Sequence, residues 1–253
     1  MLKIQSLDKA ISILNCFSVE KHILGVGDIS KMTGYTPSTV SRLLSTLENR
    51  GVLERAQGYG KYQLGYRIYQ WGMLCQKQSN LATFARPVME KLRDHCGEEV
   101  SLFVIADGHR TCLDHVPSKH GIAMVSPLGG KLPLHAGASG QVLLAFMPEE
   151  KRKSIVSKEN LECFTDKTII DPDALEEKLK QIRIKGYGIS KEEREPGAFS
   201  IVAPIRDASE QVVASLGVAG PLYRINDTVM EEYINAVLQA AEEISNKVGF
   251  FGN

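Results

Sequence analysis

The sequence contains no run of about 18 apolar residues, the length that a membrane-spanning helix requires. Its first residues alternate polar and apolar side chains and include Asp8. They therefore lack the uninterrupted apolar stretch and the small-residue cleavage site of a secretory signal peptide. A membrane span is not expected, and we expect the chain to stay in the cytoplasm.

Cysteine is sparse and shows no pairing pattern. The five cysteines are odd in number, scattered along the chain and never arranged as CxxC. In a reducing compartment this pattern predicts free thiols, most of them buried. A disulfide framework is therefore not implied.

The sequence also lacks the common signatures of enzymes. It has no Walker-type phosphate loop and no GxGxxG dinucleotide fingerprint, so nucleotide chemistry has no support. Ser139 lies in a GASGQ segment that resembles a nucleophile elbow but lacks the final glycine of G-x-S-x-G, and no predicted strand leads straight into it. We therefore expect no catalytic residues and no cofactor.

A metal site is not favoured either. His109, Cys112 and His115 are spaced at threes, with His120 nearby. On a regular strand, positions 109 and 115 share one face and position 112 lies on the other. Three ligands for one metal would require a break in the strand, so the better interpretation is histidines that are exposed or bonded to neighbours. The charge run at 191–195 is typical of a solvated loop.

Charge is unevenly divided along a chain of 253 residues whose total charge is zero. Residues 1–65 hold eight basic and five acidic side chains, a net charge of +3, and the remainder carries −3. The length allows two domains or one large domain. A mildly basic head on a mildly acidic body is consistent with nucleic-acid contact at one end.

The first helices follow from apolar spacing and capping residues. Ser6 is predicted to cap a helix whose apolar positions follow the i, i+3, i+4, i+7 pattern. These positions are Leu7, Ala10, Ile11, Leu14 and Phe17. A second, short helix is predicted to start near Gly27–Asp28, to bury Ile29 and Met32, and to stop at Gly34.

The third predicted helix carries the strongest functional signal. Thr36 is suited to cap it, Pro37 stands at its first position, and Gly51 ends it. Val40, Leu43, Leu44 and Leu47 form its apolar stripe. A short helix, a turn and a longer helix make a helix-turn-helix pattern, whose second helix enters the DNA major groove. The residues predicted to contact DNA from this helix are Thr36, Ser38, Thr39, Ser41, Arg42 and Ser45.

Two short strands are predicted after this helix. Val52–Arg55 and Lys61–Leu64 flank a turn at 57–60 that contains two glycines, an arrangement typical of a β-hairpin wing. Arg55, Tyr59 and Lys61 are predicted to contact the DNA backbone or the minor groove. The alternative is that the helical head binds another protein.

The rest of the chain predicts a connecting helix and a mixed α/β domain with a largely antiparallel sheet. The small residues of Ala136–Gly140 precede a helix and expose backbone N–H groups, which suits an anion site, although small residues also permit tight packing. The expected strands are 99–106, 110–116, 122–126, 187–190, 200–206 and 212–219, and the expected helices are 66–79, 81–96, 141–146, 148–156, 172–186 and 222–246.

Several segments together resemble the IclR family of transcriptional regulators. They include SLDKAISILNCF, DISKMTGYTPSTVSRLLSTLENRGVLER, LPLHAGASGQVLLA, GYGISKEEREPGAFSIVAPI and VVASLGVAGP, and their order covers nearly the whole chain. The resemblance implies an α+β chain with a winged helix-turn-helix domain at 1–65, a linker helix at 66–80 and a GAF-like effector-binding domain at 81–253. It also implies a homodimer, often a dimer of dimers, that binds double-stranded operator DNA.

What the family does sets further expectations. Its members repress or activate catabolic operons in response to small metabolites, often organic acids or aromatics. The role expected here is a repressor switched by a small metabolite such as an organic or sugar acid. The alternatives are a small-molecule sensor whose head binds protein and an enzyme with a helical appendage. By resemblance, the effector-binding residues are Met124, Leu132, Ala138, Ser139, Ser190, Ala198, Ser200, Gly217 and Ala219. Gly217 and Ala219 stand where relatives can offer serines, so the ligand is expected to be larger or held mainly by backbone N–H groups.

Overall fold

The computed structural model describes residues 4–18, 21–57, 60–78, 80–121, 127–157 and 160–249. The chain divides into two compact units, Met1–Gln78 and Ser79–Asn253. Among the described residues, no helix combines the length and the apolar character needed to cross a membrane.

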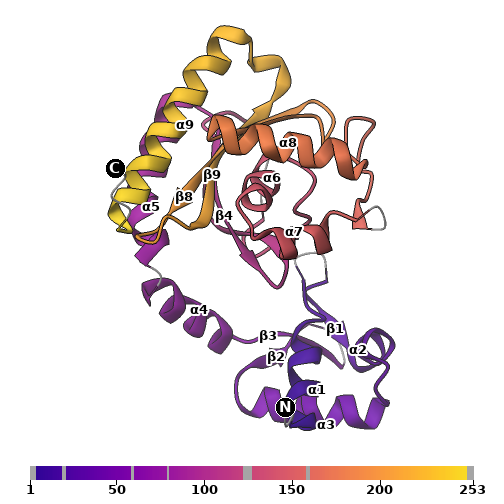
Figure 1. Ribbon diagram of the computed structural model, residues 1–253. Helices are drawn as coiled ribbons and strands as arrows, with labels where there is room; N and C mark the ends of the chain where they lie inside the picture. Colours follow the sequence, from indigo (N-terminus) through magenta and orange to yellow (C-terminus); the bar gives the residue numbers. More distant parts are fainter. Residues whose placement is uncertain are drawn as a thin grey trace. The chain divides into compact units, whose positions relative to one another are not determined.

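The first unit is a winged helix-turn-helix fold (Figure 1). Its helices are α1 (Gln5–Leu14), α2 (Val26–Thr33) and α3 (Pro37–Asn49). Its antiparallel sheet has the order β1 (Leu24–Gly25), β3 (Lys61–Leu64) and β2 (Leu53–Arg55). The hairpin of β2 and β3 is confirmed. The sequence does not predict β1, because a strand of two residues has no periodicity to detect.

A small apolar core holds this unit together. It consists of Ile13, Cys16, Leu24, Ile29, Val40, Leu44, Leu53 and Tyr62. The predicted stripe of α3 is confirmed in Val40 and Leu44, which are fully buried. In α2, Ile29 is buried as predicted, but Met32 is 47% exposed, so that prediction was wrong.

The ends of α3 agree with the sequence prediction. Pro37 occupies the first turn, and the Thr36 hydroxyl accepts a hydrogen bond from the Thr39 amide over 3.4 Å. Gly34 ends α2 with φ of +73°, and Gly51 follows α3 with φ of +68°. Both values lie in the left-handed region where glycine is favoured, so the glycines set the length of the two helices.

The start and the buried face of α1 differ from the prediction. Ser6 does not cap the helix, because Ile4 occupies the N-cap position and makes no side-chain hydrogen bond. Leu7 and Ile11 are 58% and 49% exposed, whereas Ile13 is fully buried. Apolar spacing shows which residues share a stripe of a helix, but only the neighbouring elements decide which stripe they cover.

The helix α4 (Tyr66–Gln78) follows the wing, where the linker helix is expected, and it belongs to the first compact unit. Several of its large apolar side chains are exposed to solvent. They are Tyr66, Tyr69, Trp71, Met73 and Leu74.

The second unit is built on one antiparallel sheet, as predicted. Its strand order is β6-β5-β4-β9-β8-β7, and every neighbouring pair is antiparallel. The strands are β4 (Glu99–Ala106), β5 (His109–Val116), β6 (Lys131–Leu132), β7 (Gly188–Lys191), β8 (Ala198–Arg206) and β9 (Val212–Pro221). The strand expected at 122–126 lies outside the described residues.

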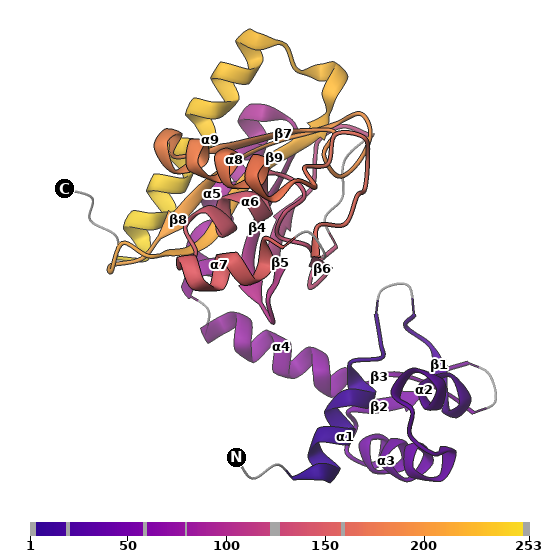
Figure 2. The ribbon, with the colours of Figure 1, turned by 45° about the vertical axis from the view of Figure 1, so that its right-hand side comes forward.

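Helices cover both faces of this sheet (Figures 1 and 2). On one face, α5 (Asn80–Cys96) and α9 (Asp227–Lys247) enclose a core with the alternate residues of β4, β8 and β9. On the other face, α6 (Ala138–Ala145) and α8 (Pro172–Lys185) enclose a second core, with α7 (Glu149–Ile155) beside them. The family-derived α+β architecture is therefore confirmed.

Two helices of the second unit begin three or more residues away from the predicted start. The helix α6 begins at Ala138 rather than at 141, with Gly137 at its N-cap in a backbone conformation of φ +89°. The helix α9 begins at Asp227 rather than at 222, because the Asn226 side chain accepts a hydrogen bond from Val229 N and a short 3-10 turn, η2 (Leu222–Arg224), precedes it. A side-chain cap sets the start of α9, whereas α6 begins after a glycine in a left-handed backbone conformation that makes no side-chain cap.

The strand β5 has one residue more than the stretch of β4 that it pairs with. Leu102 pairs with Asp114, and the next pair joins Phe103 to Cys112, so one residue of β5 forms a β-bulge. Because side chains alternate between faces, the extra residue reverses the alternation. Asp114 therefore faces α5, whereas Cys112 packs in the α6 core and Arg110 lies on that same side.

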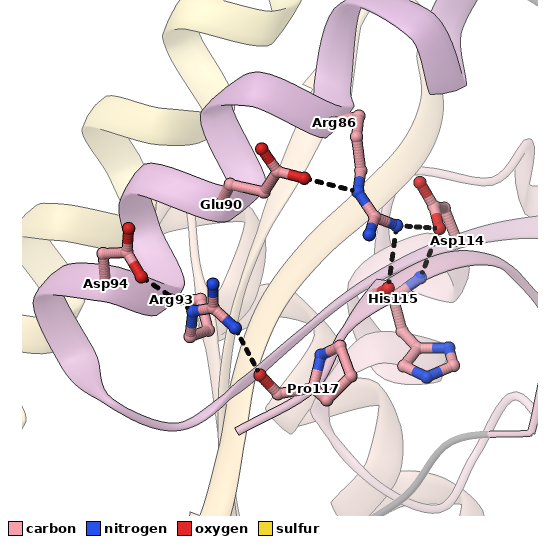
Figure 3. Close-up of polar contacts among 7 residues, drawn as sticks. All are labelled: Arg86, Glu90, Arg93, Asp94, Asp114, His115 and Pro117. Atoms are coloured by element: carbon pink, nitrogen blue, oxygen red, sulfur yellow. Dashed lines mark hydrogen bonds and ion pairs between the residues drawn. The ribbon is translucent and has the colours of Figure 1, made fainter. Parts of the chain in front are cut away.

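Two arginines of α5 form hydrogen bonds with the C-terminal end of β5 and with the residue after it (Figure 3). Arg86 donates to Asp114 over 2.9 Å and to the His115 carbonyl over 3.1 Å. About two turns further along the helix, Arg93 donates to the Pro117 carbonyl over 3.0 Å. The two arginines hold the end of β5 in register with α5.

Candidate functional site

The polar face of α3 is open to solvent. Ser38, Ser41, Arg42 and Ser45 are exposed, and Thr39 is half-buried. The Thr36 hydroxyl lies 3.1 Å from the Ser38 hydroxyl and 3.0 Å from the Thr39 hydroxyl. Thr36 therefore orders the first turn of the helix in addition to being a predicted DNA contact. The residues form one cluster of short hydroxyl side chains at the front of the helix.

Arg42 stands beside this hydroxyl cluster. Among the described residues, its guanidinium makes no hydrogen bond and no ion pair. A groove beside it is lined by both α3 and the start of α1, and it includes Lys9 and Arg42. An exposed guanidinium can bond the two acceptors of a guanine in the major groove, so this surface has the chemistry that base reading requires.

The two wing cations named by the sequence are engaged within the protein. Arg55 donates to Glu48 over 2.9 Å and lies 4.3 Å from the centre of the Tyr62 ring. Lys61 forms an ion pair with Asp28 over 2.8 Å. A DNA phosphate would therefore have to compete with the carboxylates of Glu48 and Asp28 for these two cations. The remaining predicted wing residue, Tyr59, lies outside the described residues.

The second unit contains a pocket that opens to solvent. The strands β8 and β9 supply its floor, β4 and β5 one wall, and the start of α6 with the segment after β7 its rim. It is lined by Ser101, Phe103, Arg110, Gly137, Ser139, Ser190, Glu192, Glu193, Arg194, Glu195, Ala198, Phe199, Ser200, Val202, Gly217, Val218 and Ala219.

Most of the predicted effector-binding residues come together here. Those that line the pocket are Ser139, Ser190, Ala198, Ser200, Gly217 and Ala219. Ala138 lies outside the lining because its side chain is fully buried in the α6 core, and Leu132 lies outside it on the edge strand β6. The predicted wall residue Met124 lies outside the described residues.

Glycine leaves the space for the floor of the pocket. Gly217 pairs with Val202 across β8 and β9. A Cβ atom at position 217 would come 2.5 Å from Val202 Cγ2 and 2.9 Å from the Ile201 carbonyl oxygen. Real Cβ atoms do not approach so closely, so the two strands fit together only because residue 217 has no side chain.

Arg110 is one of the pocket residues that sequence reasoning missed. Its side chain is buried, with 5% of its surface exposed. Its Nη1 donates to the Ser139 hydroxyl, and its guanidinium carbon lies 5.0 Å from the centre of the Phe103 ring. Burial, with the nearby Arg194, lowers the pKa of Arg110 to about 9, so it keeps its charge at neutral pH. Nothing in the sequence of the predicted strand 110–116 singles this arginine out.

Glu193 closes the rim of the pocket from the opposite side. It accepts hydrogen bonds from the Gln141 amide, the Gly137 backbone and the Ser190 hydroxyl. Burial raises its pKa, and Lys178 at 3.9 Å acts in the opposite direction. The run 191–195 was expected to be a solvated loop for most of its side chains, and Glu193 is a buried exception. The rim is anchored and not loose.

The histidine and cysteine spacing on β5 does not behave as predicted. His115 pairs with Ser101 and His109 with Ala106, five residues apart on β4. The bulge therefore puts the two histidines on opposite faces and Cys112 on the face of His115. Within the described part of the chain, no group of at least three histidine, cysteine, aspartate or glutamate residues is placed to hold a metal ion. The hydroxyl of Ser139, which the sequence placed in a segment resembling a nucleophile elbow, accepts a hydrogen bond from Arg110.

A winged helix-turn-helix unit and a second domain with a polar pocket define a DNA-binding transcription regulator that carries an effector-binding domain. Residues 6–57 match the family described as IclR helix-turn-helix domain, and residues 74–246 match Bacterial transcriptional regulator IclR C-terminal. The chain belongs to the IclR family of transcriptional regulators, and it is a regulator and not an enzyme.

Individual relatives agree with this assignment. HTH-type transcriptional regulator BhcR of Paracoccus denitrificans is 34% identical over 96% of this chain and 86% of that protein. Transcriptional repressor IclR of Escherichia coli is 28% identical over 98% and 91%. The crystal structure of an IclR homolog from Microbacterium hydrocarbonoxydans, complexed with 4-hydroxybenzoate, matches with a TM-score of 0.86 and 27% identity, covering 96% of this chain and 98% of that one.

Proposed function

We propose that this regulator represses a catabolic operon and that a small organic acid in the pocket of the second unit switches its binding to DNA. The observation that carries the proposal is the pocket itself, which places a buried arginine and several hydroxyls beside the start of α6. Two similarities support it: the Escherichia coli relative is named a repressor, and the Microbacterium homolog is complexed with an aromatic acid. Such a regulator works on DNA in the cytoplasm.

The DNA contacts are proposed to come mainly from α3. Ser38, Thr39, Ser41 and Ser45 offer hydroxyls to bases or phosphates, and Arg42 offers a guanidinium with no internal partner among the described residues. The wing would contribute through Arg55 and Lys61, which exchange their carboxylate partners for phosphates when DNA binds. Operator affinity should therefore fall steeply as salt rises.

We also propose that the protein is a homodimer, with a dimer of dimers as a larger form. The exposed aromatic and aliphatic side chains of α4 would leave a large apolar surface in water if the helix stayed uncovered. A second copy of the helix covers such a surface symmetrically and presents two recognition helices to a two-fold operator. In this arrangement residues 1–65 form the DNA-binding head, 66–80 the linker, and 81–253 the effector domain.

The switch is proposed to act through the spacing of the two heads. An effector changes that spacing only by binding one arrangement more tightly than the other, and the coupling is typically about 1–3 kcal/mol. The ligand would contact the rim formed by Ser190 and Glu193 as well as the start of α6. Movement of the rim together with the start of α6, to which Glu193 ties it through Gln141 and Gly137, would be transmitted to the linker helix.

A gel-shift assay on the chain's own upstream DNA tests the proposal. We expect a shift that weakens steeply between low and physiological salt, and that responds to carboxylic acids selected by thermal-shift screening of organic acids and aromatics. A shift that no acid alters would contradict the switch. No shift at any salt concentration would favour a head that binds protein instead of DNA.

A further inference from the structure

Arg110 has bonding capacity that the protein does not use. Its Nε and Nη2 atoms are buried and have no hydrogen-bond partner among the described residues. Its third nitrogen, Nη1, is held by the Ser139 hydroxyl. In the described part of the chain the guanidinium also forms no ion pair. A buried cation without an opposite charge is costly, and proteins retain such groups where a ligand supplies the missing charge.

The two unused nitrogens are the pair that can hold a carboxylate. Nε and Nη2 lie along the same edge of the planar guanidinium, and their N–H bonds point in nearly parallel directions. That edge matches the two oxygens of a carboxylate and forms two parallel charge-assisted hydrogen bonds. The remaining nitrogen, Nη1, is the one already bonded to Ser139. The serine therefore orients the fork formed by Nε and Nη2 and leaves both of these nitrogens available to a carboxylate.

The acids near the pocket are engaged elsewhere. Glu193 accepts from Gln141, Gly137 and Ser190. Glu195 accepts from Arg194 over 2.9 Å, and Glu192 accepts from the Gly197 amide over 2.8 Å. None of them forms an ion pair with Arg110 in the described structure. An external anion is therefore the natural partner of this guanidinium.

We propose that Arg110 binds the effector directly and that the effector carries a carboxylate held by Nε and Nη2. This inference rests on the proposed function, because it names the chemistry of the same pocket. The remainder of the lining indicates the rest of the molecule. Phe103, Val202 and Ala219 present apolar surface, and Ser101 and Ser200 present hydroxyls. The ligand is thus a compact monocarboxylate whose apolar body carries at most a few polar groups.

Two pairs of probes test the inference on the full chain: sodium benzoate with benzamide, and sodium acetate with acetamide. Thermal unfolding is followed at constant ionic strength, with chloride replacing the carboxylate in the reference. We expect at least one carboxylate, and neither amide, to raise the melting temperature of the wild-type chain. The Arg110→Met variant should lose this response, and its apparent affinity for the carboxylate should fall roughly ten- to hundredfold.

A matched control and a second variant keep the test decisive. Arg206 also lies over a phenylalanine ring, 4.6 Å from the centre of Phe146, but outside the pocket, so Arg206→Met should keep the carboxylate response. Arg110→Lys keeps the charge and loses the fork, and its affinity should fall between those of wild type and Arg110→Met. If Arg110→Met does not fold, the lysine variant alone decides, because full affinity with lysine would overturn the fork.

The result that overturns the inference is no carboxylate response in the wild type, or an equal response in Arg110→Met. The gel-shift assay with the same probes separates this outcome from a failure of the proposed function. Carboxylate binding through Arg110 without any change in the DNA complex would leave the inference standing and reject the switch. An acid that changes the DNA complex equally in wild type and Arg110→Met would support the switch and reject the role of Arg110.

Discussion

The ammonium of Lys61 lies 2.8 Å from the carboxylate of Asp28, which joins β3 of the wing to the first turn of α2. The same carboxylate accepts a hydrogen bond from the Gly25 amide, also over 2.8 Å. Two parts of the DNA-binding unit that are 33 residues apart in sequence thus share one charged group. The ion pair ties the wing to the first turn of α2.

Asp28→Asn should make the chain less stable at neutral pH, with a difference that disappears in acid. The hydrogen bond from Lys61, followed by that from Gly25, lowers the pKa of Asp28 in the folded chain. A lowered pKa means that the stabilisation is complete above the ordinary aspartate value and is lost as pH falls through the lowered value. Urea unfolding across this pH range, followed by the fluorescence of Trp71, measures it, since the chain has one tryptophan. Asp8→Asn, which removes an exposed carboxylate of α1, is the control.

Arg42→Ala should weaken operator binding by about 1–3 kcal/mol and relax specificity at one base position, if Arg42 reads a base. The measurement is a gel-shift titration on the operator and on single-base variants. Arg50→Ala removes a second exposed arginine at the end of α3 and is the matched control. A uniform loss across all sequences would assign Arg42 to a phosphate, and no loss would refute α3 as the recognition helix.

Thr36→Ala should destabilise the first unit by about 1 kcal/mol, because the hydroxyl accepts the Thr39 amide at the start of α3. Thr36→Ser keeps the cap and should stay close to wild type. Urea unfolding monitored at Trp71 reports the change without involving DNA, so it separates the capping role from the proposed DNA contact. Equal stability of the alanine and serine variants would show that the cap does not stabilise the helix.

Gly217→Ala should destabilise the second unit by about 1–3 kcal/mol, the usual range for overpacking. The new methyl group would overlap Val202 and approach the Ile201 carbonyl. Adding Val202→Ala should restore part of the loss, because it removes the first clash and leaves the second. Scanning calorimetry of the two single variants and the double variant measures this, with Gly121→Ala, which meets nothing within 4 Å, as control. Additive losses in the double variant would contradict the proposed contact.

Much of the fold could be read from local sequence. Thr36, Pro37 and the glycines at 34 and 51 bound α3 because capping and left-handed backbone conformations depend on a few adjacent residues. The strand Glu99–Ala106 was predicted with its observed ends, because a short apolar run that stops at the turn signal Asp107–Gly108 indicates a buried strand. The predicted serines and glycine that line the pocket came from the resemblance to the family.

The misses have a common physical cause. The exposed side of α1 and the buried Glu193 depend on which distant elements pack against them, and local periodicity does not contain that information. The place of Arg110 depends on a bulge in β5, which reverses the face of each residue before Asp114. A strand read as regular puts His109 and His115 together and gives no reason to notice the arginine between them.

The sequence by itself determined the helix-turn-helix unit, because the caps, the apolar stripe and the polar face of α3 all lie within one short segment. It also determined the family, since the matching segments cover nearly the whole chain. Only the tertiary structure decided which charges are already paired, as Lys61 is with Asp28, and which are not, as in Arg110. Pairing is a property of strand register and of packing between residues far apart in sequence, so it exists only once the chain has folded.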